Sequence, residues 1–144
     1  MDTGSEDFRR ARDVAAWILL AAMAVLIVMG AWELLDVPGA PFPESTFALR
    51  SYAAFASLLR FDVTALPVAA VLLVTFVGRP AAAARQITRV AVILQAVALS
   101  LGLIAWAASL GAALVSRWFA VSGASELAVA GAGLILTSAV LRRY

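Results

Sequence analysis

The sequence predicts an all-α integral membrane protein with four transmembrane helices in an antiparallel up-down bundle. Two observations lead to this fold class. The composition is 64% apolar and only 14% charged, with a mean hydropathy of +0.98, and four long runs contain almost no charge. Soluble domains are roughly half apolar and a quarter charged, so the excess must face a bilayer. We predict a single transmembrane domain over residues 1–144.

The first apolar run lies between Asp13 and Glu33 and is long enough to cross a membrane. A crossing needs about 20 residues, because the hydrocarbon core is about 30 Å thick and a helix rises about 1.5 Å per residue. A signal peptide is the competing interpretation, but this run is longer than a usual signal core and acidic residues precede it. The four spans are predicted at 14–35, 61–78, 87–116 and 123–141.

The first connection, residues 36–60, is the only sizeable segment predicted outside the membrane. Its clustered prolines exclude a helix at its start, whereas good capping residues and helically spaced apolar residues predict a helix from Ser45. That helix either lies on the outer leaflet or forms the upper turns of a long second helix. The long helix is favoured, because no Gly or Pro separates Ser45 from Pro67. In the second connection, Gly78 and Pro80 predict a tight turn.

The arginines predict that both the N- and the C-terminus are cytoplasmic. All 11 basic residues are Arg, and basic residues are retained in cytoplasmic loops. Most of them flank the predicted inner ends of the spans, namely Arg9, Arg10, Arg12, Arg79, Arg85, Arg89, Arg142 and Arg143. The predicted outer side holds Arg50, Arg60 and Arg117. An Ala-rich chain with Arg and no Lys is typical of a GC-rich genome, so we predict a multi-pass protein of a bacterial plasma (inner) membrane.

The sequence lacks Cys, His and Lys, which removes several kinds of chemistry. Disulfides, thiolate or imidazole metal sites, His-ligated haem, His bases and Lys Schiff bases are all excluded. No phosphate-binding glycine loop, paired-carboxylate motif or Ser-based catalytic group stands out. We therefore predict no enzyme, no metal, no cofactor and no nucleic-acid partner.

Charged residues near the predicted outer boundary are candidate functional residues, because ionisable groups are costly in a membrane. Glu33 ends the first span, Asp62 begins the second and Glu126 begins the fourth. With Arg60 and Arg117, these acids are predicted to form an ion-pair cluster at the outer mouth of the bundle. Each residue could instead mark where a span meets water. The functional alternative is a vestibule that attracts cations or protons, or a polar contact with a partner subunit.

Two further features concern helix packing. Gln95 is the deepest strongly polar residue, and it is predicted to form a hydrogen bond to another helix; a substrate contact is the alternative. Small residues at close spacing in the fourth span predict a helix-packing face formed by Ala124, Ala128, Gly131 and Ala132. Small faces let helices approach closely in lipid. This face packs either inside the bundle or against another subunit.

Three arginines, Arg79, Arg85 and Arg89, surround the start of the third span. They could contact anionic lipid headgroups, with about 1 kcal/mol from each basic residue near the surface. The alternative is that they act only as topology determinants.

The leading functional hypothesis is a non-catalytic accessory subunit that associates with other membrane proteins or with copies of itself in a larger complex. Its compact size and lack of reactive residues favour this. The alternative is an oligomeric ion channel or small-solute transporter with an acidic outer mouth. A membrane enzyme acting on lipids is the third hypothesis, with the outer acids as its only possible acid or base groups.

Overall fold

The computed structural model describes residues 3–35, 47–59, 61–77, 83–110 and 117–143. Within these ranges the chain is helical and contains no strand. The helices are α1 (Thr3–Leu34), α2 (Phe47–Leu58), α3 (Phe61–Phe76), α4 (Ala84–Ser109) and α5 (Arg117–Leu141). Four stretches are long and apolar enough to cross a membrane: one in each of α1, α4 and α5, and a fourth formed by α2 and α3 together. The prediction of an all-helical protein with four candidate spans is confirmed.

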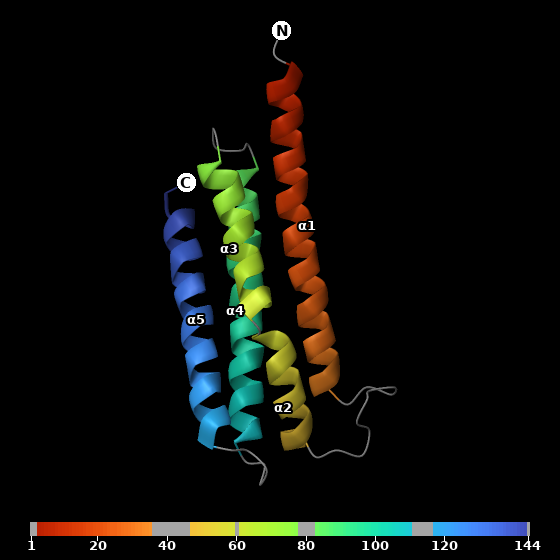
Figure 1. Cartoon of the computed structure of the whole chain (residues 1–144), viewed down its shortest axis with the longest axis vertical. Coiled ribbons are helices and arrows are strands. Elements are labelled where there is room, and N and C mark those ends of the chain that lie inside the picture. Colours follow the sequence, from red (N-terminus) through yellow and green to blue (C-terminus); the bar gives the residue numbers. More distant parts are fainter. Residues whose placement is uncertain (1–2, 36–46, 60, 78–82, 111–116, 144) are drawn as a thin grey trace.

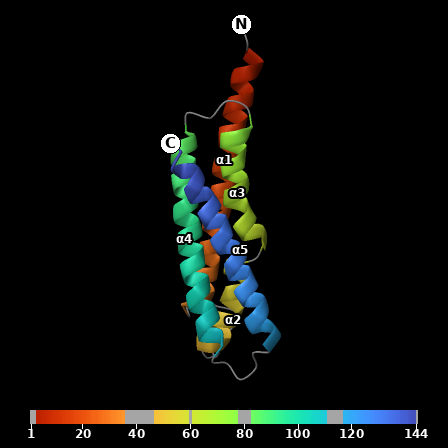
Figure 2. The same cartoon turned by 90° about the vertical axis from the view of Figure 1, so that its left-hand side faces the viewer.

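The helices lie side by side along one long axis (Figures 1 and 2). α4 occupies the middle of the bundle and packs against each of the other four helices, whereas α1 and α5 lie on opposite sides of it. The start of α1 projects beyond the other helices at the end where α5 finishes (Figure 1). This projecting part carries the exposed charged residues Glu6, Asp7, Arg9 and Arg10, so it suits water better than lipid.

The path of the second candidate span is interrupted. The sequence favours one long helix from Ser45 through Pro67, but α2 ends at Leu58 and α3 begins at Phe61. α2 packs lengthwise against α1 and α4, so it lies within the bundle (Figure 1). Pro67 lies inside α3 without ending it.

The interruption coincides with two leucines that face glycines on other helices. Leu58 packs against Gly30 of α1, and Leu59 packs against Gly102 of α4; both leucines are at most 1% exposed. A Cβ atom at Gly30 would lie 2.6 Å from Leu58 Cγ, and one at Gly102 would lie 2.5 Å from Leu59 Cδ1. Only glycine leaves room for these contacts. The break after Leu58 is therefore accompanied by packing of Leu58 and Leu59 against two neighbouring helices. The sequence of α2 alone does not predict this break.

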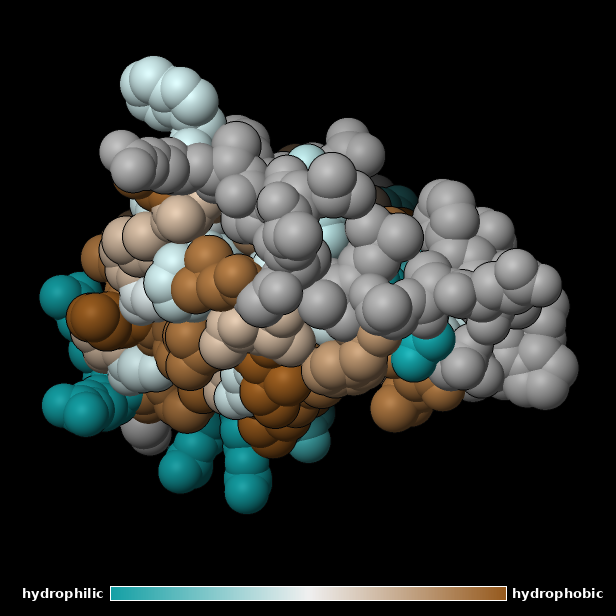
Figure 3. All heavy atoms as spheres, turned by 90° about the horizontal axis from the view of Figure 1, so that it is seen from below, coloured by the Kyte–Doolittle hydropathy of each residue, from teal (hydrophilic) through white to brown (hydrophobic). Residues whose placement is uncertain are grey.

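The surface of the bundle is strongly apolar. Large hydrophobic side chains that are at least half exposed occur on α1, α3, α4 and α5, including Val28, Phe76, Ile93 and Ile135. Seen from the end at which α2 lies, hydrophobic side chains reach the outside of the molecule between the hydrophilic ones (Figure 3). A water-soluble protein of this size rarely exposes so much contiguous apolar area, whereas a bilayer solvates it.

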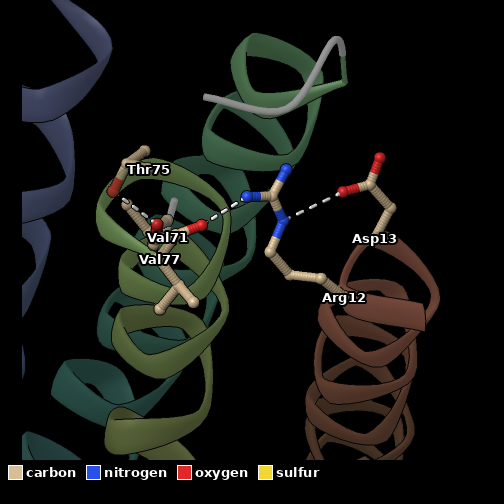
Figure 4. A network of polar contacts seen from close by, with 5 residues as sticks. All are labelled: Arg12, Asp13, Val71, Thr75 and Val77. Carbon is tan, nitrogen blue, oxygen red and sulfur yellow. Dashed lines mark hydrogen bonds and ion pairs between the residues drawn. The ribbon is translucent and has the colours of Figure 1, made fainter. Parts of the chain in front are cut away.

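Arg12 joins α1 to the end of α3 (Figure 4). Its side chain is 3% exposed, Nη1 donates a hydrogen bond to the carbonyl of Val77, and Nε lies 3.5 Å from Asp13 Oδ1. The last carbonyls of a helix lack intrahelical donors and carry partial negative charge, so a cation stabilises them. Sequence analysis assigned Arg12 to membrane topology alone, and the structure adds a packing role.

Candidate functional site

Glu33 lies at the end of α1, where it faces α2. Ser57 of α2 donates a hydrogen bond from Oγ to Glu33 Oε2 at 2.8 Å. This contact ties the last turn of α1 to α2 and supplies a hydrogen-bond donor to the carboxylate. Glu33 therefore has a structural partner on the face of α2 that looks toward α1.

Glu126 lies on a different side of α2. Because α5 begins at Arg117, Glu126 is about two and a half turns inside this helix. The carboxylate is half-buried and lines two adjacent cavities between α5 and the α2–α3 segment. We call these two cavities together the Glu126 pocket.

The larger cavity of the Glu126 pocket has a volume of about 210 Å³ and is lined by Tyr52, Phe55, Ala56, Phe119, Ser122 and Glu126. The smaller cavity measures about 120 Å³ and is lined by Leu59, Thr64, Ser125, Glu126 and Val129. Tyr52, Ser122 and Ser125 are exposed, so the pocket is reached from the surface of the bundle. It combines a carboxylate, several hydroxyl groups and aromatic rings.

Three aromatic rings lie together at the wall of the larger cavity. The ring centroids of Tyr52 and Phe119 are 4.6 Å apart, and Phe55 meets Phe119 edge-on at 5.4 Å. Such tilted and edge-to-face contacts are favourable geometries for aromatic pairs. Through these rings α2 and α5 touch on the side of α2 that faces away from Glu33.

Of the predicted outer cluster, the structure describes only the side chains of Glu33 and Glu126. Glu33 and Glu126 are separated by α2, since Ser57 faces α1 whereas Tyr52 and Ala56 face α5. Arg60 lies outside the described residues, and the side chains of Asp62 and Arg117 are also outside the described part. Among the described residues, no group of three His, Cys, Asp or Glu side chains could hold a metal ion.

Gln95 forms a contact between α4 and α5 in the middle of the bundle. It is 5% exposed, and Thr137 Oγ1 donates a hydrogen bond to Gln95 Oε1 at 2.5 Å. The same hydroxyl lies 3.0 Å from the carbonyl of Gly133 on its own helix. Sequence reasoning expected an interhelical hydrogen bond from Gln95, but nothing in the pattern identified Thr137 as the partner.

The small residues of the predicted packing face lie on the outside of α5. Ala124, Ala128 and Ala132 are exposed, and a Cβ atom placed on Gly131 would meet no atom within 4 Å. The buried residues of α5 occupy its other side and recur every seven residues, at Gly123, Ala130 and Thr137. The sequence allows this small-residue face to lie either inside the bundle or on its outside. In the structure it lies on the outside.

Two of the arginines proposed to contact lipid are exposed near the start of α4. Arg85 and Arg89 lie four residues apart, hence on one side of the helix, at the end of the bundle from which α1 projects. Arg79 lies outside the described residues. Nothing in the described contacts binds Arg85 or Arg89 to another helix.

Comparison with known proteins gives no relative: no protein-family model, no curated protein and no solved structure matches the chain. The class of protein therefore follows from the fold alone. Four candidate spans and an apolar surface describe a helical multi-pass membrane protein.

Sequence reasoning did not find the aromatic wall of the Glu126 pocket. Tyr52 and Phe55 belong to the helically spaced apolar residues that follow Ser45, and this pattern is equally typical of a core. Their association with Phe119 depends on how α5 is placed against α2, and no local signal encodes that placement. The only available signal was the carboxylate of Glu126 inside a predicted span.

Proposed function

We propose that this protein is a non-catalytic accessory subunit of a membrane complex. It associates with other membrane proteins, or with copies of itself, through the outward small-residue face of α5 formed by Ala124, Ala128, Gly131 and Ala132. In lipid, apolar burial gives helices little reason to associate, so contact depends on close approach of backbones and on packing. A face without bulky side chains meets that requirement.

The observation that supports the proposal is the unfilled space over Gly131. No atom lies within 4 Å of the position of its Cβ, although the neighbouring Ala128 and Ala132 continue the same small surface. Exposed positions on another side of α5 carry bulky residues such as Val129 and Leu136, which are 50% and 62% exposed and suit contact with lipid chains. α5 is also the least buried of the four candidate spans.

The alternative function, an oligomeric channel or transporter with an acidic mouth, has less support. It needs its acids to line one opening, whereas Glu33 and Glu126 lie on opposite sides of α2. Glu33 is also engaged by Ser57. The accessory-subunit proposal needs no such convergence of charge.

The proposal includes a location and an orientation. We place the protein in a bacterial inner membrane with both chain ends in the cytoplasm, because most arginines flank the end at which α1 starts and α5 finishes. Arg79, Arg85 and Arg89 would then lie near anionic headgroups. The chain contains no Cys, so single cysteines at Phe8 and at the exposed Phe47, which precedes the second candidate span, can be labelled with a membrane-impermeant thiol reagent in intact cells. Labelling of Phe47→Cys alone is expected, and labelling of Phe8→Cys would contradict the orientation.

The association is tested by measuring the mass of the intact particle extracted from its native membrane in mild detergent. The wild-type chain is expected in a particle with at least one further protein chain. Gly131→Leu should fold and release a single chain, because the new side chain holds the partner away. Ala22→Leu, which enlarges an exposed residue on α1, is the matched control and should leave the particle intact. A wild-type chain that is alone in its particle would contradict the proposal.

A further inference from the structure

We propose that the Glu126 pocket binds a small organic ammonium cation. The ligand class follows from a carboxylate beside three aromatic rings in a cavity between α2 and α5. This binding is independent of association through the small-residue face, because Glu126 lies on the part of α5 that faces α2 and α3.

The first argument is charge. Glu126 is the only charged residue among the described residues that line the two cavities. Within the described part of the chain, no residue donates a hydrogen bond to it or forms an ion pair with it. A carboxylate held about two and a half turns inside a candidate span is costly unless something compensates it. A bound cation supplies that compensation.

The second argument is the aromatic wall. Tyr52, Phe55 and Phe119 border the same cavity as the carboxylate, with centroid distances of 4.6 and 5.4 Å between the contacting rings. Ring faces attract cations, and clusters of rings are a recurrent way to recognise alkylammonium groups. A carboxylate and aromatic rings together favour an ion that has both a positive charge and an apolar surface.

The third argument concerns the kind of cation. Metal ions such as Ca²⁺ and Mg²⁺ take six or more oxygen ligands and usually need several carboxylates. The described residues offer no group of three acidic, His or Cys side chains at this place or elsewhere. A weakly hydrated ammonium ion needs one carboxylate and an apolar enclosure instead. The 210 Å³ cavity has room for such an ion, and the exposed Tyr52 and Ser122 mark its entrance.

Choline is a suitable probe, since 3,3-dimethylbutan-1-ol has the same shape without the charge. Binding of both compounds to the full chain in phosphatidylglycerol nanodiscs can be followed by ligand-observed NMR titration. Choline is expected to bind saturably, and the neutral isostere is expected to bind at least about tenfold more weakly. Equal binding of the two compounds, or no saturable binding of choline, would overturn the proposal.

Three variants test whether choline binds in the Glu126 pocket. Glu126→Gln keeps the shape of the side chain and removes its charge, so choline affinity should fall about tenfold or more. Glu33→Gln is the matched control: it neutralises an acid on the other side of α2 and should leave the affinity within about twofold. Phe119→Leu retains apolar volume but removes a ring, and should weaken binding by roughly three- to tenfold. Unchanged binding in Glu126→Gln, or an equal loss in Glu33→Gln, contradicts the assignment.

The same ammonium group occurs in free solutes and in lipid headgroups. A titration in nanodiscs of a second lipid distinguishes these two sources of the ligand. If the natural ligand is a headgroup, phosphatidylcholine nanodiscs will compete with free choline and weaken its apparent affinity. If the ligand is a free cation, choline will bind equally in both bilayers when both titrations are done at high salt, which screens the charge of phosphatidylglycerol. Circular dichroism of each variant checks that the helices are retained, and Phe119→Leu provides a readout should Glu126→Gln fail to fold.

Discussion

Gly123 and Gly131 lie about two turns apart on α5 but have opposite surroundings. A Cβ atom at Gly123 would meet Trp106 Cδ1 at 2.4 Å and Phe55 Cζ at 3.2 Å, whereas one at Gly131 would meet nothing within 4 Å. Gly123 leaves room for the indole ring of Trp106 from α4, inside the bundle. Gly131 leaves a flat surface on the outside of the bundle. One side of α5 therefore holds the protein together, while the other is available to a partner.

The difference implies that stability and association are separable by substitutions on one helix. Changes on the inner side of α5, or at other buried contacts between helices, should lower the free energy of unfolding. Changes on its outer side should affect only the assembly. Unfolding can be followed by circular dichroism as a denaturing detergent is added to the protein in mild detergent.

The largest loss of stability is expected for Gly123→Ala. The added methyl group would overlap the Trp106 ring, which is too rigid to move aside easily, so the free energy of unfolding should fall by about 1–3 kcal/mol. Gly131→Ala is the control on the same helix. It adds the same atom into open space, and it should not destabilise the protein. Equal losses in both variants would remove the distinction between the two faces.

A loss of about 1.5 kcal/mol is expected for Arg12→Gln. The substitution removes a charged donor from the carbonyl of Val77 at the end of α3. Arg10→Gln changes an exposed arginine on the same helix and should alter the unfolding free energy by less than about 0.5 kcal/mol. If both variants were equally stable, Arg12 would contribute only to topology.

A smaller loss, about 0.6 kcal/mol, is expected for Thr137→Val. The substitution removes the hydrogen bond that the Thr137 hydroxyl donates to Gln95 Oε1, and interhelical hydrogen bonds in membranes contribute about 0.6 kcal/mol on average. Thr137→Ser keeps the hydroxyl and should retain most of the interaction. A double-mutant cycle with Gln95→Leu isolates the pair, and a coupling energy of zero would show that the two side chains act independently.

The smallest effect on stability is expected for Ala128→Leu on the outer face of α5. Ala128 is exposed, so a larger side chain meets no other part of the chain, and the unfolding free energy should stay within about 0.5 kcal/mol. The assembly should nevertheless be lost. A clear loss of stability in the isolated chain would mean that this face packs within the protein.

The helices themselves were largely predictable from sequence, because the thickness of a bilayer sets how long an apolar run must be. Runs such as the one after Asp13 and the one that holds Gln95 exceed this length, and both correspond to helices in the structure. The same reasoning missed the interruption after Leu58. That break accompanies contacts with Gly30 and Gly102, which lie far away in the sequence.

The candidate site was less predictable for the same reason. The spacing of Ala124, Ala128 and Ala132 identifies a small face, but it does not say whether that face points into the bundle or away from it. Hydropathy likewise placed Glu33 and Glu126 near one boundary, without showing that α2 lies between them. Relations across helices depend on the packing of the whole bundle, and composition and spacing describe only one helix at a time.

Photo-crosslinking in the native membrane tests most directly whether the outer face of α5 meets a protein. A benzophenone amino acid is placed at Ala128 and, for comparison, at Val25 of α1 and Ile93 of α4, which are 58% and 54% exposed. Illumination is expected to give a discrete protein adduct from position 128 and only lipid adducts from the other two. Lipid adducts alone at position 128, or the same protein adduct at all three positions, would contradict a dedicated contact face on α5.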